Sequence, residues 1–295
     1  MAFNPTVLID PRGALPAPAR GWAVITGCST GIGRELVGQC RAAGWGVVAT
    51  ARSLAALADL APGDDLRCLE LDVTRPASIA AAAAACADLK VTALVNNAGY
   101  GQMGPLEYVS PDELRAQLET NVVGLHAATL AFLPLVRRGA APGAGRIVQV
   151  ASVLGRMSVP MAGAYCASKH AVVALAEALR LEVEPEVRVI LVEPGAIRSE
   201  FRHTLLRVLG DLPERVRGTR FEPALRHYLA RREAGWEHAL GAPACAGRIA
   251  WAMTRNPPPR RLVIGLDAFW ANLAKAALPA ALWEWAVRRA FRLGG

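Results

Sequence analysis

Tyr165 and Lys169 stand four residues apart in a stretch with a helical pattern, so both side chains are expected on one face of a helix. A free tyrosine has a pKa of about 10 and is a poor base at neutral pH. An ammonium group about 4 Å away contributes roughly 4 kcal/mol at an effective dielectric constant of about 20, which lowers a phenol pKa by about three units at most. The spacing therefore predicts an acid/base pair, with Tyr165 as the reacting group and Lys169 as the group that tunes it.

Ser152 precedes this pair and follows directly on an apolar segment, 146–151, that we expect to be a strand. A hydroxyl at the carboxyl end of a parallel strand lies where such folds bind their ligands. There it can donate a hydrogen bond to a substrate oxygen as negative charge develops. Ser158 and Ser168 are the nearby alternatives, and the position after the strand favours Ser152.

A glycine-rich segment follows the first expected strand, 22–26, and opens a helical pattern. Glycines at such a turn let the backbone approach a pyrophosphate, and the helix N-terminus offers unpaired N–H groups with a partial positive charge. The spacing G-x-x-x-G-x-G differs from the commoner G-x-G-x-x-G, and an ordinary tight turn is the alternative. The predicted phosphate-binding residues are Gly27, Ser29, Thr30, Gly31, Ile32 and Gly33.

The second expected strand, 46–51, ends at Ala51 and is followed by Arg52. An acidic residue at this place would bind the ribose 2′-hydroxyl of NAD, whereas an arginine can face a 2′-phosphate. The sequence therefore predicts NADP(H) as the cofactor, with NAD(H) second and a merely solvated Arg52 as the alternative reading.

Short β-branched runs alternate with longer helical stretches from residue 22 to about 264, which is typical of a parallel sheet covered on both faces. We expect a doubly wound, Rossmann-like α/β fold with helices that include 31–43, 111–136 and 164–182. We assign residues 21–265 to one catalytic domain, with an N-terminal arm over 1–20, a helical substrate lid over about 199–241 and a C-terminal helical tail over 266–295. The seven expected strands are 22–26, 46–51, 66–71, 93–96, 146–151, 187–193 and 262–264.

The tail pattern, interrupted by Pro279, places Glu284, Arg288 and Arg292 on one helical face, with aromatic and aliphatic residues elsewhere. A basic amphipathic helix can lie on a membrane surface. Packing against the body of the protein or a partner subunit is the favoured alternative.

The composition limits the kinds of partner that we expect the protein to bind. The formal net charge of +8 comes from arginines spread along the chain, without the aromatic-interleaved basic patch of a nucleic-acid binder. Six scattered cysteines form no C-x-x-C pair, which favours a reducing cytoplasm and no structural metal. Much of the apolar content is alanine, so no segment is expected to span a membrane.

The chain resembles the short-chain dehydrogenase/reductase family over nearly the whole stretch from residue 22 to about 265. The residues in its motifs are similar to those of the branch that includes hydroxysteroid and retinol dehydrogenases. The motifs that carry the resemblance are Thr26-Gly27-x-x-x-Gly31-x-Gly33, Asp72-Val73, Asn96-Asn97-Ala98-Gly99, Asn121, Ser152, Tyr165-x-x-x-Lys169 and Pro194-Gly195.

The resemblance implies roles for residues that spacing alone does not assign. Asp72 would receive the adenine amino group, Val73 would line the adenine pocket, and Lys169 would also hold the nicotinamide ribose. Asn121 would complete a proton relay to Lys169, and family members commonly form dimers or tetramers. The other residues expected beside the cofactor are Asn97, Ala98, Gly99, Pro194, Gly195, Ile197 and Ser199, where Ser199 replaces the family threonine and Arg198 is unexpected.

The sequence thus predicts an NADP-dependent oxidoreductase acting on a hydrophobic alcohol or ketone, such as a steroid-, retinoid- or lipid-like carbonyl compound. Gln102, Met103, residues 155–161 and the lid are expected to line its substrate pocket. A non-catalytic, NADP-binding redox sensor is the alternative, but such a module has no use for Ser152, Tyr165 and Lys169. A nucleotide-sugar epimerase or dehydratase is disfavoured by the glycine spacing.

Overall fold

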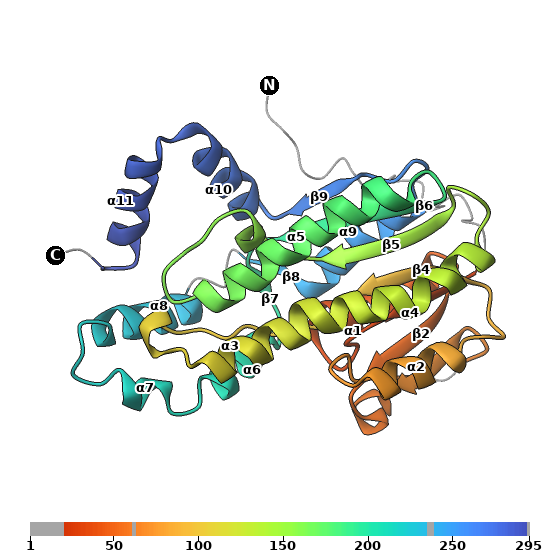
Figure 1. Ribbon diagram of the computed structural model, residues 1–295, viewed down its shortest axis with the longest axis horizontal. Coiled ribbons are helices and arrows are strands. Elements are labelled where there is room, and N and C mark those ends of the chain that lie inside the picture. Colours follow the sequence, from red (N-terminus) through yellow and green to blue (C-terminus); the bar gives the residue numbers. More distant parts are fainter. Residues whose placement is uncertain (1–20, 61–62, 235–238, 294–295) are drawn as a thin grey trace.

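The computed structural model describes residues 21–60, 63–234 and 239–293, so the arm predicted over 1–20 lies outside the described residues. Its centre is a parallel sheet of seven strands in the order β3-β2-β1-β4-β5-β6-β9, as expected for a doubly wound fold (Figure 1). Each expected strand is present, with ends that differ by at most two residues. The strands are β1 (Trp22–Ile25), β2 (Gly46–Ala51), β3 (Leu66–Glu70), β4 (Val91–Asn96), β5 (Gly145–Val150), β6 (Val187–Pro194) and β9 (Arg261–Ile264).

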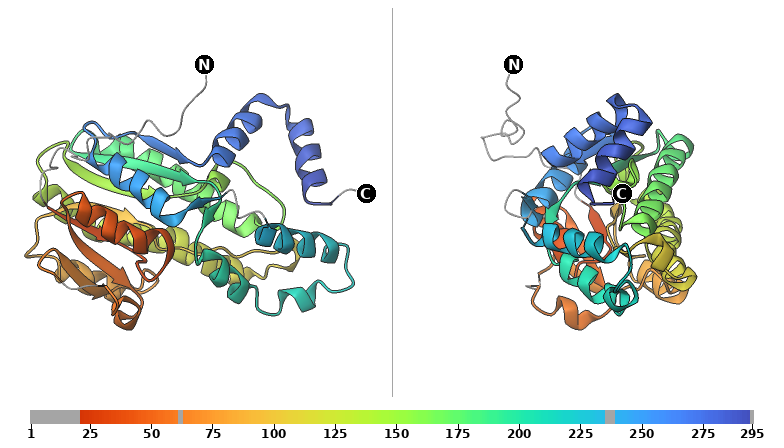
Figure 2. Two further views of the ribbon diagram at one scale, coloured as in Figure 1. Left: turned by 180° about the vertical axis from the view of Figure 1, so that it is seen from behind. Right: turned by 90° about the vertical axis from the view of Figure 1, so that its left-hand side faces the viewer.

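Helices cover both faces of the sheet because the central strands carry apolar residues on both sides. On one face α1 (Gly31–Ala42) and α9 (Ala242–Thr254) pack over Ile25 and Ile190. On the other face α2 (Pro76–Ala84), α4 (Gly124–Gly139) and α5 (Gly163–Val183) pack over Leu94 and Ile147 (Figure 2). Single 3₁₀ turns lie at η2 (Leu54–Leu57), η3 (Leu106–Tyr108) and η5 (Val153–Gly155).

The single helix expected over 111–136 is divided in the structure. It consists of α3 (Pro111–Leu118), a π-helical turn η4 (Glu119–Val123) and α4. The turn holds Asn121, whose amide bonds the backbone of Tyr100 and the hydroxyl of Ser168 instead of facing outward. These contacts come from distant residues, so the local helical pattern gives no sign of them.

The run Pro111–Gly139 is long and apolar enough to cross a membrane by length and composition, which the sequence analysis did not anticipate. In the structure Phe132 and Val136 of this run are fully buried against the sheet. The run therefore serves as a core helix of the domain.

The predicted lid consists of three helices, α6 (Phe201–Leu209), α7 (Leu212–Arg215) and α8 (Glu222–Ala234), which lie beside one end of the sheet (Figure 1). They enclose an apolar cluster that includes Met103, Leu205, Leu212 and Tyr228. A small pair of strands that was not predicted, β7 (Ile197–Arg198) and β8 (Leu240–Gly241), joins the beginning and the end of the lid segment.

The tail forms two helices, α10 (Leu266–Ala277) and α11 (Ala280–Ala290), and the break at Pro279 is where the sequence indicated. The two helices stand away from the body of the molecule (Figures 1 and 2). Ala268 is the only buried residue of α10, and α11 has none. Of the favoured alternatives, packing against the body holds only at the two ends of the tail, and packing against a partner subunit stays a prediction.

Candidate active site

A cavity of about 1090 Å³ runs from the carboxyl ends of the central strands to the space beneath the lid. The glycine-rich loop, the end of β2 and the loop after β4 form one part of the cavity wall. The side chains of Tyr165, Lys169 and Ser152 line the same cavity. The structure thus brings the predicted phosphate-binding and acid/base residues to one site. Of the predicted catalytic and cofactor-binding residues, Gly33 and Asn121 alone do not line this cavity.

The glycine-rich loop is packed closely against the loop after β4. Gly27 has φ +73°, and a Cβ added there would lie 2.9 Å from the Ala98 Cα. The Thr26 hydroxyl accepts hydrogen bonds from the backbone N–H groups of Asn97 and Ala98, both at 3.0 Å. Asn97 in turn donates its side-chain amide to the carbonyls of Thr26 and Gly27. Asn97 therefore holds the loop in place, and a side chain at Gly33 would collide with Gly27 and Asn97.

The N-terminus of α1 fits a pyrophosphate. Its N-cap residue, Thr30, makes no side-chain cap bond, and the first turn carries no acidic residue. Ser29, Thr30 and Ile32 line the cavity, so the unpaired N–H groups of this turn face the place where an anion would sit. Gly31, with φ +62°, faces Ser199 across the loop.

The far end of the cavity is formed by Arg52, Asp72 and Val73. The Asp72 carboxylate accepts bonds from the backbone and the hydroxyl of Thr74, which fixes its orientation at the wall. Arg52 is exposed at the cavity rim and forms no ion pair with any other described residue. A guanidinium in this position is available for a phosphate group.

Tyr165 and Lys169 project from α5 into the cavity, as their spacing predicted. The Lys169 Nζ lies 5.7 Å from the centre of the Tyr165 ring and donates a 2.8 Å bond to the Val150 carbonyl. Only 5% of Lys169 is exposed, and this burial lowers its pKa to about 8. No acidic group is paired with it among the described residues, so the ammonium is directed at the phenol and the cavity.

Ser152 lies at the same edge, where η5 begins. Its hydroxyl is 3.5 Å from the Pro194 carbonyl and accepts a bond from the Leu154 N–H. Of the three serines that the sequence offered, Ser152 alone lines the cavity: Ser158 is exposed, and Ser168 is fully buried against Asn121.

Asn121 lies near the acid/base pair, where it bonds Tyr100 and the neighbouring Ser168. A Cβ added at Gly99 would be 2.9 Å from the Asn121 Oδ1 and 3.8 Å from the Lys169 Nζ, so Gly99 lies close to both side chains. Gly99 thus has no room for a side chain, and Asn121 is fully buried. The geometry places Asn121 next to Lys169 but outside the cavity wall.

The segment from Pro194 to Ser199 forms the wall opposite α5, with Pro194, Gly195, Ile197 and Ser199 facing the cavity. Sequence reasoning missed Asp267, the first acidic residue of α10. Its carboxylate accepts a 2.6 Å bond from the Ala196 N–H and leaves no room for a side chain at Gly195. An acidic residue in the first turn of a helix is too common to have indicated this contact.

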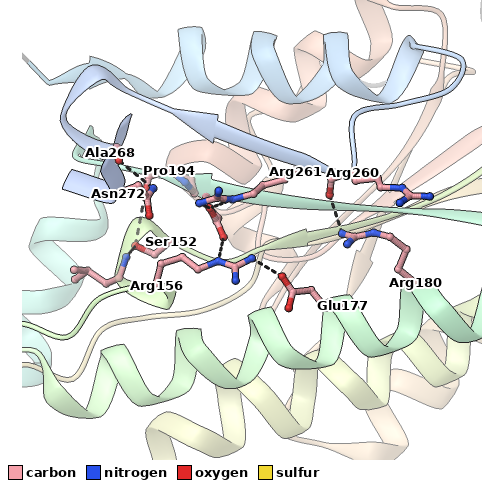
Figure 3. A network of polar contacts seen from close by, with 11 residues as sticks. Ser152, Arg156, Glu177, Arg180, Pro194, Arg260, Arg261, Ala268 and Asn272 are labelled. Atoms are coloured by element: carbon pink, nitrogen blue, oxygen red, sulfur yellow. Dashed lines mark hydrogen bonds and ion pairs between the residues drawn. The ribbon is translucent and has the colours of Figure 1, made fainter. Parts of the chain in front are cut away.

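Ser152 and Pro194 are also held by a network of ion pairs that was not anticipated (Figure 3). Glu193 is fully buried, and its carboxylate accepts a 2.8 Å bond from Arg156 and a 2.6 Å bond from Arg261. Arg156 follows the η5 turn that Ser152 opens, and it also bonds Glu177 of α5. The network therefore ties the Ser152 turn, β6, β9 and α5 together.

Removing one partner of Glu193 is expected to destabilise the fold, because it leaves the buried carboxylate with only one of its two guanidinium partners. We expect Arg261→Ala to lower the free energy of unfolding by about 2 kcal/mol, as measured by urea denaturation. The neighbouring Arg260→Ala is the control: Arg260 is mostly exposed and makes one 3.4 Å contact, so its loss should cost less than about 0.5 kcal/mol. Equal stability of the two variants would contradict this account of the network.

Beneath the lid the cavity wall carries the apolar side chains of Met103, Val159, Phe201, Tyr228 and Phe291, and the lid also contributes Thr204, Arg207 and His227 to it. Two expectations for this pocket are wrong. Gln102 is buried elsewhere, with its N–H bonded to Gln117, and Val159 is the only residue of 155–161 that lines the cavity. Gly155 instead packs against the Lys169 backbone, and a side chain there would not fit.

The cysteines are structural. All six are free thiols, and burial raises the pKa of Cys28, Cys40 and Cys245 to about 12, so these side chains stay neutral. In the part of the chain that the structure describes, no three His, Cys, Asp or Glu side chains gather as metal ligands.

Comparison with known proteins points to a single family. A family model described as short chain dehydrogenase matches residues 21–208. An uncharacterized oxidoreductase, YbbO of Escherichia coli K12, is 31% identical over 268 residues, which are 87% of this chain and 90% of YbbO. The human 17-beta-hydroxysteroid dehydrogenase type 1 is 34% identical over 255 residues, covering 82% of this chain and 76% of that enzyme. The resemblance to the hydroxysteroid dehydrogenase branch is thereby confirmed.

Solved structures agree with the fold. A short-chain dehydrogenase/reductase from Burkholderia phymatum in complex with NAD superposes with a TM-score of 0.74 at 28% identity, over 90% of this chain and 95% of that one. A short chain dehydrogenase from Burkholderia cenocepacia J2315 in complex with NADP gives a TM-score of 0.70 at 27% identity, over 89% and 95%. Both are bound to nicotinamide dinucleotides.

Proposed function

The chain belongs to the short-chain dehydrogenase family of oxidoreductases, and from this premise we propose that it interconverts a hydrophobic alcohol and its ketone or aldehyde with NADP(H) as cofactor. The observation that carries the proposal is the single cavity into which Tyr165, Lys169 and Ser152 open at one part and the α1 N-terminus and Arg52 at another. The apolar side chains of the wall beneath the lid support a bulky hydrophobic substrate.

The residues that would hold NADP(H) are those predicted from the sequence. The α1 N-terminus with Gly27, Ser29, Thr30, Gly31 and Ile32 would bind the pyrophosphate, supported from below by Gly33. Arg52 would bind the 2′-phosphate, Asp72 and Val73 the adenine, and Lys169 the nicotinamide ribose. The remaining residues proposed to lie along the cofactor are Asn97, Ala98, Gly99, Tyr165, Pro194, Gly195, Ile197 and Ser199.

The chemistry of the protein side chains is proton transfer and charge stabilisation. A bound nicotinamide supplies or accepts the hydride. The Tyr165 hydroxyl donates its proton to a carbonyl oxygen in reduction and receives it in oxidation. The Ser152 hydroxyl donates a hydrogen bond to the same oxygen while charge builds there. The Lys169 ammonium favours the ionised phenol, and Asn121, which bonds Tyr100 and Ser168, would complete a proton relay to Lys169.

Turnover itself is tested by following NADPH absorbance while hydrophobic ketones of steroid-, retinoid- and lipid-like structure are offered to the purified protein. The proposal expects saturable consumption of NADPH with at least one of them. If the protein binds NADPH but consumes none with any carbonyl compound, the non-catalytic sensor becomes the better reading.

The cofactor preference is expected to rest on Arg52. We expect Arg52→Ala to weaken NADPH binding by about tenfold to a hundredfold, since one charge-assisted phosphate contact is worth roughly 1.5–3 kcal/mol. NADH binding should change less than about twofold, and Arg75→Ala, an exposed arginine outside the cavity wall, should alter neither. Isothermal titration with both cofactors measures this, and an unchanged ratio of their Kd values would remove Arg52 from the assignment.

We also propose that the protein forms a homodimer or homotetramer, resides in the cytoplasm and touches membranes through its C-terminal tail. The free cysteines support a reducing compartment. The exposed apolar residues of α10 and α11 support an external partner for the tail.

A further inference from the structure

The helices α10 and α11, which we call the C-terminal helix pair, carry an unusual share of the exposed apolar surface. Six of the thirteen large apolar side chains that are exposed in the described chain belong to this pair, and a seventh, Leu278, lies between the two helices. Every aromatic residue of the thirteen is among these seven. Trp270 is 61% exposed and Trp285 is 62% exposed. A soluble surface rarely gathers such residues unless something covers them. The seven are Leu266, Phe269, Trp270, Leu273, Leu278, Leu282 and Trp285.

The charges of the pair are mainly positive and lie among these apolar residues. The Lys275 ammonium is 5.5 Å from the Trp283 ring centre, and the Arg289 guanidinium is 5.8 Å from the Trp285 ring centre. The other basic residues are Arg288 and Arg292, and the acidic ones are Glu284 and Asp267. Four basic and two acidic side chains give residues 266–293 a net charge of +2, and Asp267 lies at the beginning of the pair, where it bonds the Ala196 N–H.

Both ends of the helix pair reach the cavity. Asp267, at its beginning, holds the loop after β6 beside the proposed cofactor site. At its end Phe291 stacks on Tyr228 of the lid, with ring centres 6.0 Å apart, and both Ala290 and Phe291 line the cavity. Whatever covers the helix pair therefore lies next to residues of the cavity wall.

We propose that the C-terminal helix pair docks on an anionic phospholipid bilayer, and that the apolar substrate passes from the bilayer into the cavity beside Phe291. Exposed tryptophans interspersed with cations are the side chains that bind the interface of an anionic membrane. A second copy of the chain is a poorer occupant, because a twofold contact would set this positive surface against itself. The passage of substrate rests on the proposed function, whereas the docking does not.

The docking is tested by sedimenting the full-length protein with vesicles of phosphatidylglycerol and phosphatidylcholine, and with phosphatidylcholine alone. The wild type is expected to pellet with the anionic vesicles, at least tenfold more than with the neutral ones, and to be released by high salt. The double variant Trp270→Ala/Trp285→Ala should lose at least tenfold in partition. The control Leu181→Ala removes an apolar side chain that is 85% exposed on α5, and it should pellet like the wild type.

Two further measurements distinguish docking on a bilayer from contact with a second copy of the chain, and docking from the proposed function. Light scattering gives the oligomeric state, and a wild type that ignores vesicles while the double tryptophan variant dissociates into smaller species would overturn the proposal in favour of a second copy. Turnover of a vesicle-embedded ketone should fall in the double variant, while turnover of a short, water-soluble ketone should not. Vesicle binding without any turnover would contradict the proposed function and leave the docking intact, whereas equal pelleting of wild type and double variant would refute the docking.

Discussion

Tyr165→Phe is expected to lower kcat by roughly 10³-fold, which corresponds to about 4 kcal/mol in the activation free energy. The variant keeps the ring that lies 5.9 Å from the Phe201 ring, so the cavity wall remains, but the transferable proton is gone. The Kd of NADPH should change less than about threefold, because a single hydroxyl contributes little to so large a ligand. Stopped-flow or steady-state NADPH consumption measures the first quantity, and fluorescence titration measures the second.

Tyr108→Phe serves as the matched control for this change. Tyr108 lies outside the cavity wall and packs its ring edge-on against Phe221, so losing its hydroxyl should leave kcat within about twofold of the wild type. A Tyr165→Phe variant that turned over as fast as the Tyr108→Phe variant would exclude Tyr165 as the acid/base.

Lys169→Met is expected to be inactive and yet more stable than the wild type. Burial lowers the Lys169 pKa from an ordinary 10.5 to about 8, so the folded protein holds the ammonium at a cost of roughly 3 kcal/mol at neutral pH. Methionine fills a similar volume without a charge. We therefore expect the free energy of unfolding to rise by up to about 3 kcal/mol at pH 7, while kcat falls at least about 10²-fold.

The pH dependence of this gain has a definite sign. Between pH 8 and about 10.5 the unfolded chain binds a proton at Lys169 that the folded chain has lost, so this residue makes the wild type more stable as pH rises. The advantage of Lys169→Met should therefore be full below pH 8 and shrink towards pH 10. Urea denaturation of both proteins at each pH cancels the titration of the cysteines, and Lys90→Met is the control for replacing a lysine at an exposed position. A variant less stable than the wild type at every pH would contradict the assignment of burial as the cause.

The features predicted correctly from the sequence are those that depend on residues close to one another along the chain. The parallel sheet with helices on both faces follows from the alternation of short apolar runs with helical stretches, and the glycine loop is read directly from Gly27, Gly31 and Gly33. The Tyr165 and Lys169 pair was found because four residues on a helix share a face, and the helix is indeed continuous there. Ser152 was singled out because it follows a strand that ends at the binding edge of the sheet.

The features that were missed depend on contacts between distant parts of the chain. The π-helical turn is held by Asn121 bonds to Tyr100 and Ser168, and two-residue strands such as β7 and β8 have no periodicity to detect. The Arg261 bond to Glu193 joins residues 68 apart in sequence. Phe291 lines the cavity only because the tail returns to the lid, and its sequence reads as an ordinary amphipathic helix.

The central claim is that the phenol and the ammonium act as one unit, and a double-mutant cycle tests it most directly. The quantity to measure is kcat/KM for one hydrophobic ketone with wild type, Tyr165→Phe, Lys169→Met and the double variant. If Lys169 acts through Tyr165, the double variant should be about as slow as Tyr165→Phe alone, since nothing is left for the lysine to tune. Losses that multiply in the double variant would mean that the two residues act independently, and would contradict the account.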